Sequence, residues 1–172
     1  MNKRVKQIVQ VALYVAIISV SAMITVPLGA VPFTLQTFAI TLVLFVAKPK
    51  TALTTLVLYL ALGAVGAPIF SAMKGGIGSL LGPTGGFLWG YLIGIFPVCA
   101  LLQKTKTAPA QIALGCLLTL VAYIFGCAQY MFVAGVNLQV ALLTTVVPFI
   151  AIDIIKIVIA WGVSKKVLSV QQ

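Results

Sequence analysis

Two residues near the C-terminal end of the chain have the chemistry to bind a polar group inside a membrane. Asp153 is the only acidic residue of the 172, and it lies in an apolar run, residues 148–156, that ends at Lys156. The two residues are three apart, so on a helix they share one face. A charge at the centre of a bilayer costs about 2.5 to 3.5 kcal/mol even on insertion scales, so it needs a reason to be there. The pair could be a neutralised structural link to neighbouring helices, but we favour a donor and an acceptor for a small ligand.

The rest of the composition argues against catalysis. The chain has no histidine, and one Asp without any Glu cannot supply paired carboxylates or a carboxylate-rich metal site. The Gly-rich stretch that begins at Lys74 and Gly75 lacks the G-x-x-x-x-G-K-[ST] order of a phosphate-binding loop. We therefore predict that the chain is not an enzyme, has no catalytic residues, metal or cofactor, and does not use ATP itself.

The elements that must position these residues are membrane helices. Of all residues, 62% are apolar and 7% charged, which is typical of an integral membrane protein. Because a membrane helix needs roughly 20 apolar residues, the breaks in the sequence predict an all-α bundle of six transmembrane helices in a single membrane domain, 1–172. The helices are expected at 7–26, 33–47, 51–66, 85–103, 109–132 and 148–163. The polar stretch 135–147 is expected to be an extramembrane loop with about one helical turn.

Basic residues set the orientation of these helices. All of them except Lys74 and Lys156 fall at the two termini or in the connections on one side of the membrane. The excess of Lys and Arg predicts that this side, with both termini, is cytoplasmic, and that the chain is a multi-pass protein of the plasma membrane in a prokaryote. The net charge of +10 therefore reflects topology, and we predict no nucleic-acid partner.

Glycines and aromatic residues mark the fourth expected helix. Gly86, Gly90 and Gly94 recur at four-residue spacing, which allows two membrane helices to approach closely. Trp89 and Tyr91 lie beside them, where bulky aromatic side chains either face the membrane interface or line a cavity.

Polar residues before this helix are further candidates. Thr84 could cap the helix, and the Gly-rich stretch 66–84 with Lys74 is either a lid over a site or a linker. Gln36, early in the second expected helix, could be satisfied by neighbouring backbone or could face a polar ligand. In the first helix, Ala12 and Ala16 form a small-x-x-x-small pair, which by residue type alone favours internal packing over a partner surface.

Four blocks of the chain resemble one family. They are VPFTLQTF (31–38), YLALGAVGAPIF (59–70), GPTGGF (82–87) and Pro148-Phe149 followed by Asp153 and Lys156. Their order and combination are similar to the BioY family, the biotin-binding S components of energy-coupling factor (ECF) vitamin transporters. One departure is Ile152, where the family commonly has Gly, so the packing of the last helix is expected to differ there.

The resemblance implies a six-helix protein that captures biotin from outside and works with a membrane T component and two cytoplasmic ATPase subunits. It implies that Asp153 and Lys156 contact the ligand and that Ala12 and Ala16 face the T component. Weaker binding candidates are Gln36, Thr84, Tyr91 and Trp89, and Lys74 with Gly75 in the outer loop could meet the valerate carboxylate. The alternatives are an S component for another small vitamin and a solitary biotin facilitator.

Overall fold

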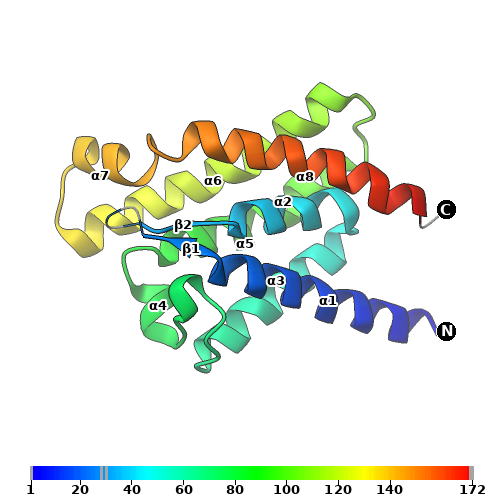
Figure 1. Cartoon of the computed structure of the whole chain (residues 1–172), viewed down its shortest axis with the longest axis horizontal. Coiled ribbons are helices and arrows are strands. Elements are labelled where there is room, and N and C mark those ends of the chain that lie inside the picture. The colour runs from blue at the N-terminus through cyan, green and yellow to red at the C-terminus, as the bar shows by residue number, and fades with distance from the viewer. Residues whose placement is uncertain (1, 28, 30, 171–172) are drawn as a thin grey trace.

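The chain folds into a bundle of α-helices, as the sequence predicts (Figure 1). The computed structural model describes residues 2–27, 29 and 31–170. Its elements, in chain order, are α1 (Lys3–Met23), β1 (Thr25–Val26), β2 (Phe33–Thr34), α2 (Gln36–Val46), α3 (Pro49–Ala64), the 3₁₀ turn η1 (Ser71–Met73), α4 (Ile77–Leu81), α5 (Gly85–Leu102), α6 (Ala108–Ala134), α7 (Leu138–Thr145) and α8 (Ile150–Val170).

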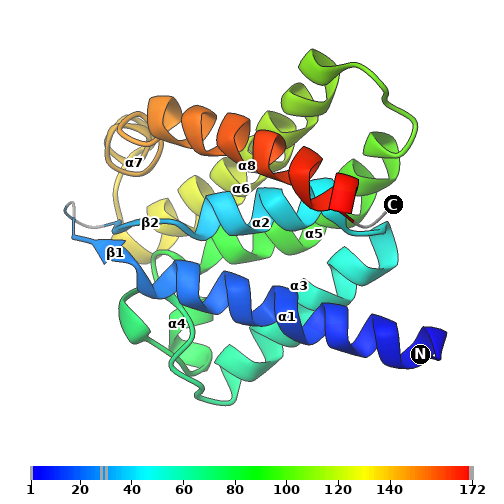
Figure 2. The same ribbon diagram turned by 45° about the vertical axis from the view of Figure 1, so that its right-hand side comes forward.

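The six longer helices share one apolar core. In this bundle, α5 packs along α6, α2 packs against α8, and α1 contacts both α2 and α3. Fully buried side chains come from each of these helices: Ile18, Ile40, Tyr59, Ile95, Leu118 and Ile157. The shorter elements α4 and α7 and the β1–β2 hairpin gather at the end of the bundle away from the termini (Figure 2).

The first connection is a β-hairpin instead of a simple link. Helix α1 was expected to continue to residue 26, but it ends at Met23, and Thr25 and Val26 pair with Thr34 and Phe33 in an antiparallel ladder. The physical reason is local, because β-branched residues followed by Pro27 disfavour the helical conformation and favour an extended one. The hairpin also takes Phe33 and Thr34 out of the second expected helix.

Two of the expected spans are shorter than a bilayer requires. Helix α2 has 11 residues and α3 has 16, which correspond to about 17 and 24 Å at 1.5 Å per residue. Among the described residues, α1, α5 and α6 are long and apolar enough to cross a membrane, and α7 with α8 counts as a fourth span if the pair is taken as one broken helix. The predicted count of six therefore rests on accepting α2 and α3 as short spans inside the bundle.

Close contact between α5 and α6 explains the glycine spacing. A Cβ at Gly90 would lie 2.5 Å from Cα of Ala122, and one at Gly94 would lie 2.8 Å from Cδ1 of Leu118. Real Cβ atoms do not approach other atoms this closely, so a side chain at Gly90 would push the backbone of α6 away, whereas one at Gly94 would displace the end of the Leu118 side chain.

The last expected span begins with a break in the helix. Residues 138–145 form helix α7, longer than the single turn expected in this loop, and its axis is bent by 45° from that of α8. Asn137 caps α7, since its side chain accepts a hydrogen bond from the backbone N–H of Val140 at 2.9 Å. Helix α8 then starts at Ile150 and continues to Val170, beyond the expected end at residue 163.

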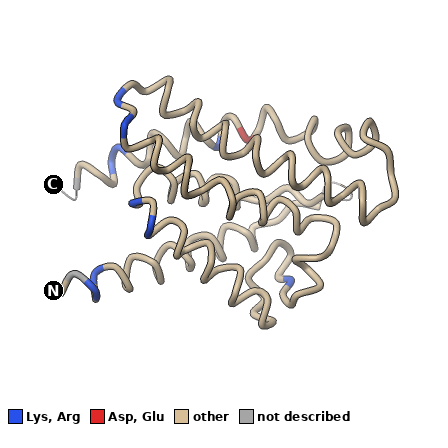
Figure 3. Tube along the Cα trace, turned by 180° about the vertical axis from the view of Figure 1, so that it is seen from behind, with Lys and Arg blue, Asp and Glu red and all other residues tan. Residues whose placement is uncertain are grey.

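Charged residues are distributed unevenly along the bundle. Lysines and arginine cluster at the end that carries both termini, and the opposite end carries Lys74 (Figure 3). Asp153 lies between these ends, inside the bundle. Most of the basic residues thus gather at one end of the bundle, and the side of the membrane that this end faces stays a prediction.

Candidate functional site

A cavity of about 490 Å³ lies among the helices near the end of the bundle away from the termini. Its walls come from the segment after β1, from β2 and α2, from the connection between α3 and α5, and from α5, α6, α7 and α8. Its polar lining residues are Thr34, Gln36, Thr37, Ser71, Lys74, Ser79, Thr84, Tyr91, Tyr123, Thr145, Asp153 and Lys156. Phe70, Phe87, Leu88 and Phe149 are among its apolar ones. This volume is within the range of about 300 to 1,000 Å³ that is usual for small-molecule sites.

Asp153 and Lys156 form a buried ion pair on the cavity wall. Lys156 Nζ donates to Asp153 Oδ1 at 2.8 Å, and the two residues are 6% and 5% exposed. Asp153 lies in the first turn of α8, where the helix dipole favours a negative charge. The break between α7 and α8 creates this helix start inside the protein, so the local fold helps to stabilise the carboxylate.

Each member of the pair has a second partner on another element. Tyr123 in α6 donates its hydroxyl proton to Asp153 Oδ2 at 2.7 Å. Lys156 Nζ donates to the backbone oxygen of Thr34 at 2.6 Å and lies 3.9 Å from the ring centroid of Phe33. The pair therefore ties α8 to α6 and to the β1–β2 hairpin, and at the same time it faces the cavity.

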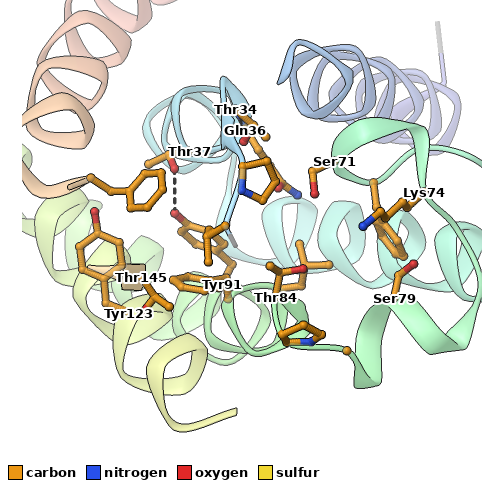
Figure 4. A pocket seen from close by; sticks show the side chains of 18 of the residues that line it. Thr34, Gln36, Thr37, Ser71, Lys74, Ser79, Thr84, Tyr91, Tyr123 and Thr145 are labelled. Atoms are coloured by element: carbon orange, nitrogen blue, oxygen red, sulfur yellow. Dashed lines mark hydrogen bonds between the residues drawn. The ribbon is translucent and has the colours of Figure 1, made fainter. Parts of the chain in front are cut away.

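Other polar side chains surround the same space from different elements (Figure 4). Tyr91 in α5 donates to Thr37 Oγ1 in α2 at 3.2 Å. Gln36 Nε2 donates to Tyr59 at 3.0 Å, and the Tyr59 hydroxyl donates in turn to the oxygen of Ile69 at 2.9 Å. Lys74 lies beside Ser79 on the opposite side of the cavity from Tyr123.

The structure brings most of the predicted binding residues to this one cavity. Asp153, Lys156, Gln36, Thr84, Tyr91, Lys74 and Gly75 all line it. Trp89 does not: it is directed toward α4, and its indole N–H donates to the oxygen of Leu80 at 3.1 Å. Trp89 is two residues from both Phe87 and Tyr91, and at 3.6 residues per turn this spacing places its side chain on a different face of α5 from those two lining residues.

The Gly-rich stretch forms part of the cavity wall. Its residues Ser71, Lys74, Gly75, Gly78 and Ser79 line the cavity. A Cβ at Gly75 would collide with the backbone oxygen of Ala67, so a side chain there would push the wall outward. Lys74 itself is exposed to solvent at the rim.

Tyr123 is the main lining residue that sequence reasoning missed. It lies inside a long apolar helix, 30 residues from its partner Asp153, so no local spacing relates the two. The only signal was an aromatic hydroxyl in an apolar run, which usually finds a partner when it is buried.

Two further predictions concern residues outside the cavity. Ala12 and Ala16 are exposed on α1, which argues against internal packing and leaves them free to contact a partner. Ile152, at the position where the sequence departs from the family pattern, is 36% exposed on α8, so its side chain lies at the surface of the protein. Among residues 2–27, 29 and 31–170, no three His, Cys, Asp or Glu side chains cluster as a metal site would need.

Helices long enough to cross a membrane and a partly polar cavity inside the bundle define a multi-pass membrane protein with an internal small-molecule site. The sequence model of the BioY family matches residues 1–172, and the chain belongs to this family.

Similar proteins agree with this assignment. The chain is 36% identical to the biotin transporter BioY of Thermotoga maritima, over 90% of this chain and 91% of that protein. It is 39% identical to the biotin transporter BioY2 of Lactococcus lactis subsp. cremoris, over 92% of this chain and 87% of that protein. The crystal structure of an S component for biotin from an ECF-type ABC transporter has the same fold, with a TM-score of 0.90 at 24% identity over 98% of this chain and 95% of that one.

Proposed function

We propose that this chain is the substrate-capture S component of an ECF-type importer and that its cavity binds biotin. The observation that carries the proposal is the buried Asp153–Lys156 pair on the wall of a cavity of about 490 Å³. Membership in a family whose relatives are named as biotin transporters supports the choice of ligand. The chain supplies binding, and the energy for transport comes from its partners.

The chemistry of biotin matches the lining of the cavity. Its ureido group presents two N–H donors and a carbonyl acceptor, and its bicyclic body and aliphatic tail suit apolar walls such as Phe87, Leu88 and Phe149. Each oxygen of Asp153 accepts one hydrogen bond inside the protein, and a carboxylate oxygen has room for a second. Asp153 would thus accept a hydrogen bond from a ureido N–H and still accept those from Tyr123 and Lys156.

The opposite side of the cavity suits the carboxylate of the ligand. Lys74 is the cation at that rim, next to the hydroxyl groups of Ser71 and Ser79. Lys156 is less available than the sequence suggested, because its ammonium group already has Asp153, Thr34 and the ring of Phe33 as partners. We therefore propose that Lys74 binds the valerate carboxylate. Lys156 has one N–H left with which it can donate to a ligand oxygen.

The proposed topology is a single domain with six membrane-crossing segments, α1, α2, α3, α5, α6 and the α7–α8 pair, in the plasma membrane. The lysine-rich end, with both termini, faces the cytoplasm, and the cavity opens toward the outside. In this orientation the cavity receives biotin from the medium. Ala12 and Ala16, exposed on α1, form the contact with the T component, which couples the chain to two ATPase subunits.

The ligand can be identified directly. The detergent-purified chain is incubated with a mixture of water-soluble vitamins and washed, and the retained small molecule is identified by mass spectrometry. We expect about one biotin per chain. Retention of a different vitamin would identify that vitamin, and not biotin, as the ligand. Retention of none would contradict the proposal.

A solitary facilitator is the second candidate function, and uptake measurements separate it from an S component. Cells that produce the chain with the T component and both ATPases should accumulate biotin, and cells that produce the chain alone should not. Equal uptake in both would favour a facilitator.

A further inference from the structure

The wall of the cavity between α4 and α5 is held by one side chain from α6. Nε2 of Gln129 donates to the backbone oxygen of Leu80 at 2.9 Å and to that of Gly82 at 2.6 Å. Leu80 and Gly82 lie at the C-terminal end of α4, where backbone oxygens have no partner within the helix. Gln129 therefore donates to two carbonyl groups at the end of α4, of which that of Gly82 also accepts from the backbone N–H of Gly85 at 3.1 Å.

Two glycines make this contact possible. A Cβ at Gly86 would lie 2.8 Å from Cβ of Gln129, and a Cβ at Gly85 would lie 2.9 Å from its Nε2. The same Cβ atoms would also overlap the backbone of Leu80 and of Phe125, so the two glycines let α4 and α6 approach the start of α5 closely at the place where the Gln129 side chain reaches the wall. Gly86, like Gly90, is required by the packing of α5 on α6, and Gly85 by the close approach of Leu80, with the Gln129 side chain as a further close neighbour of Gly85 and Gly86.

Trp89 is a second donor to the same wall. Its indole N–H shares the oxygen of Leu80 with Gln129, at 3.1 Å. Trp89 and Gln129 come from α5 and α6, so the wall is fastened to the two helices that pack most closely in the bundle. We call these three hydrogen bonds to Leu80 and Gly82 the wall clamp.

The clamped segment forms one wall of the cavity. Gly78 and Ser79 of α4, and Gly82, Pro83 and Thr84 after it, all line the cavity, and α4 is only five residues long. A helix of this length has little stability of its own, so its position depends on tertiary contacts. Release of the clamp would let the wall move outward at the rim of the cavity.

We propose that Gln129 is a positioning residue that keeps this wall closed and thereby sets how long the ligand stays bound. The inference rests on the proposed function only for the identity of the ligand. Gln129 does not line the cavity, so it acts through the wall and not through direct contact.

The test compares Gln129→Met with wild type. Methionine keeps the length and bulk of the side chain but cannot donate a hydrogen bond. Two quantities are measured: the dissociation rate of radiolabelled biotin, and backbone hydrogen exchange of residues 76–85 in the ligand-free protein. Because each lost hydrogen bond weakens the clamp by the net strength of one bond, we expect both rates to rise about tenfold. Gln129→Glu, which places an anion against two carbonyl oxygens, should raise them further.

Gln111→Met is the matched control. Gln111 lies in the same helix and is also half-buried, but its hydrogen bonds to Thr105, Trp161 and Lys165 lie at the opposite end of the bundle. Both rates should stay at the wild-type values in this variant.

Each outcome decides the proposal. Faster exchange with an unchanged dissociation rate would overturn it, since the clamp would then serve stability alone, and no change in either rate would also overturn it. If Gln129→Met does not fold, Trp89→Phe removes one bond of the clamp and should raise both rates by a factor of about three to five. If wild type binds no biotin, the proposed function fails, and the exchange rates alone support or overturn the clamp.

Discussion

At the scale of single residues, the buried ion pair combines two roles that the sequence presented as alternatives. Asp153 and Lys156 link α8 to α6 and to the hairpin through Tyr123 and the oxygen of Thr34, and both also face the cavity. Their spacing of three residues made the pair predictable. Tyr123 and Thr34 were not, because they lie 30 and 122 residues away in sequence and reach the pair only through the tertiary fold.

Tyr123→Phe tests the structural role of this network. The change removes the hydroxyl donor from a buried carboxylate without changing the packing of the ring. A hydrogen bond of this kind is worth about 1 to 2 kcal/mol in a membrane protein, so the free energy of unfolding should fall by that amount. Denaturant titration in detergent measures it.

Tyr130→Phe provides the comparison for that experiment. Tyr130 is a buried tyrosine of the same helix that does not line the cavity. Its substitution should change the free energy of unfolding by less than about 0.5 kcal/mol. Equal losses in the two variants would show that the Tyr123–Asp153 bond contributes nothing specific.

At the scale of elements, composition and proline positions located the long helices but not the short ones. The start of α5 at Gly85 matches the predicted start. Helices α3 and α6 also begin within a few residues of their own predicted starts. The hairpin and α4 were missed because their stability comes from contacts made after folding. Strand β2 is held by Lys156, and α4 by Gln129 and Trp89.

Gly90→Ala tests whether close packing of α5 on α6 holds the bundle together. The new methyl group would overlap Cα of Ala122, which is backbone and cannot rotate away. Overpacking of this kind costs about 1 to 3 kcal/mol, so the thermal midpoint in detergent should fall.

Gly162→Ala is the opposite case on α8. A Cβ there meets nothing within 4 Å, and alanine favours the helix by about 0.5 to 1 kcal/mol over glycine. Its midpoint should therefore stay the same or rise. A midpoint for Gly90→Ala as high as that of Gly162→Ala would contradict the packing argument.

At the scale of the whole molecule, the two ends of the bundle differ in chemistry. The lysine-rich end carries the termini, and the other end carries the hairpin and α4, residues of which line the cavity. The charge bias of the connections was enough to predict this arrangement. The sequence could not predict which face of α1 is free, because that depends on how α1 packs against α2 and α3.

Replacing Ala12 and Ala16 together by Trp tests the proposed partner surface on that free face. Both residues are exposed and far in the chain from the cavity lining, so biotin binding should stay at the wild-type level. Uptake by cells that contain the T component and the ATPases should be abolished, because bulky side chains prevent close approach of the partner.

Ala128→Trp, at an exposed position of α6, is the control for this experiment and should leave uptake intact. Loss of biotin binding together with uptake in the Ala12 and Ala16 variant would argue against an interface role.

The central claim is that biotin binds in the cavity through the carboxylate of Asp153, and titration calorimetry of biotin with wild type and Asp153→Asn tests it most directly. A hydrogen bond to a charged acceptor contributes about 1.5 to 3 kcal/mol, so the variant, if it remains monodisperse on size exclusion, should bind biotin about 10 to 100 times more weakly. Wild-type affinity in the folded Asp153→Asn protein would contradict the claim.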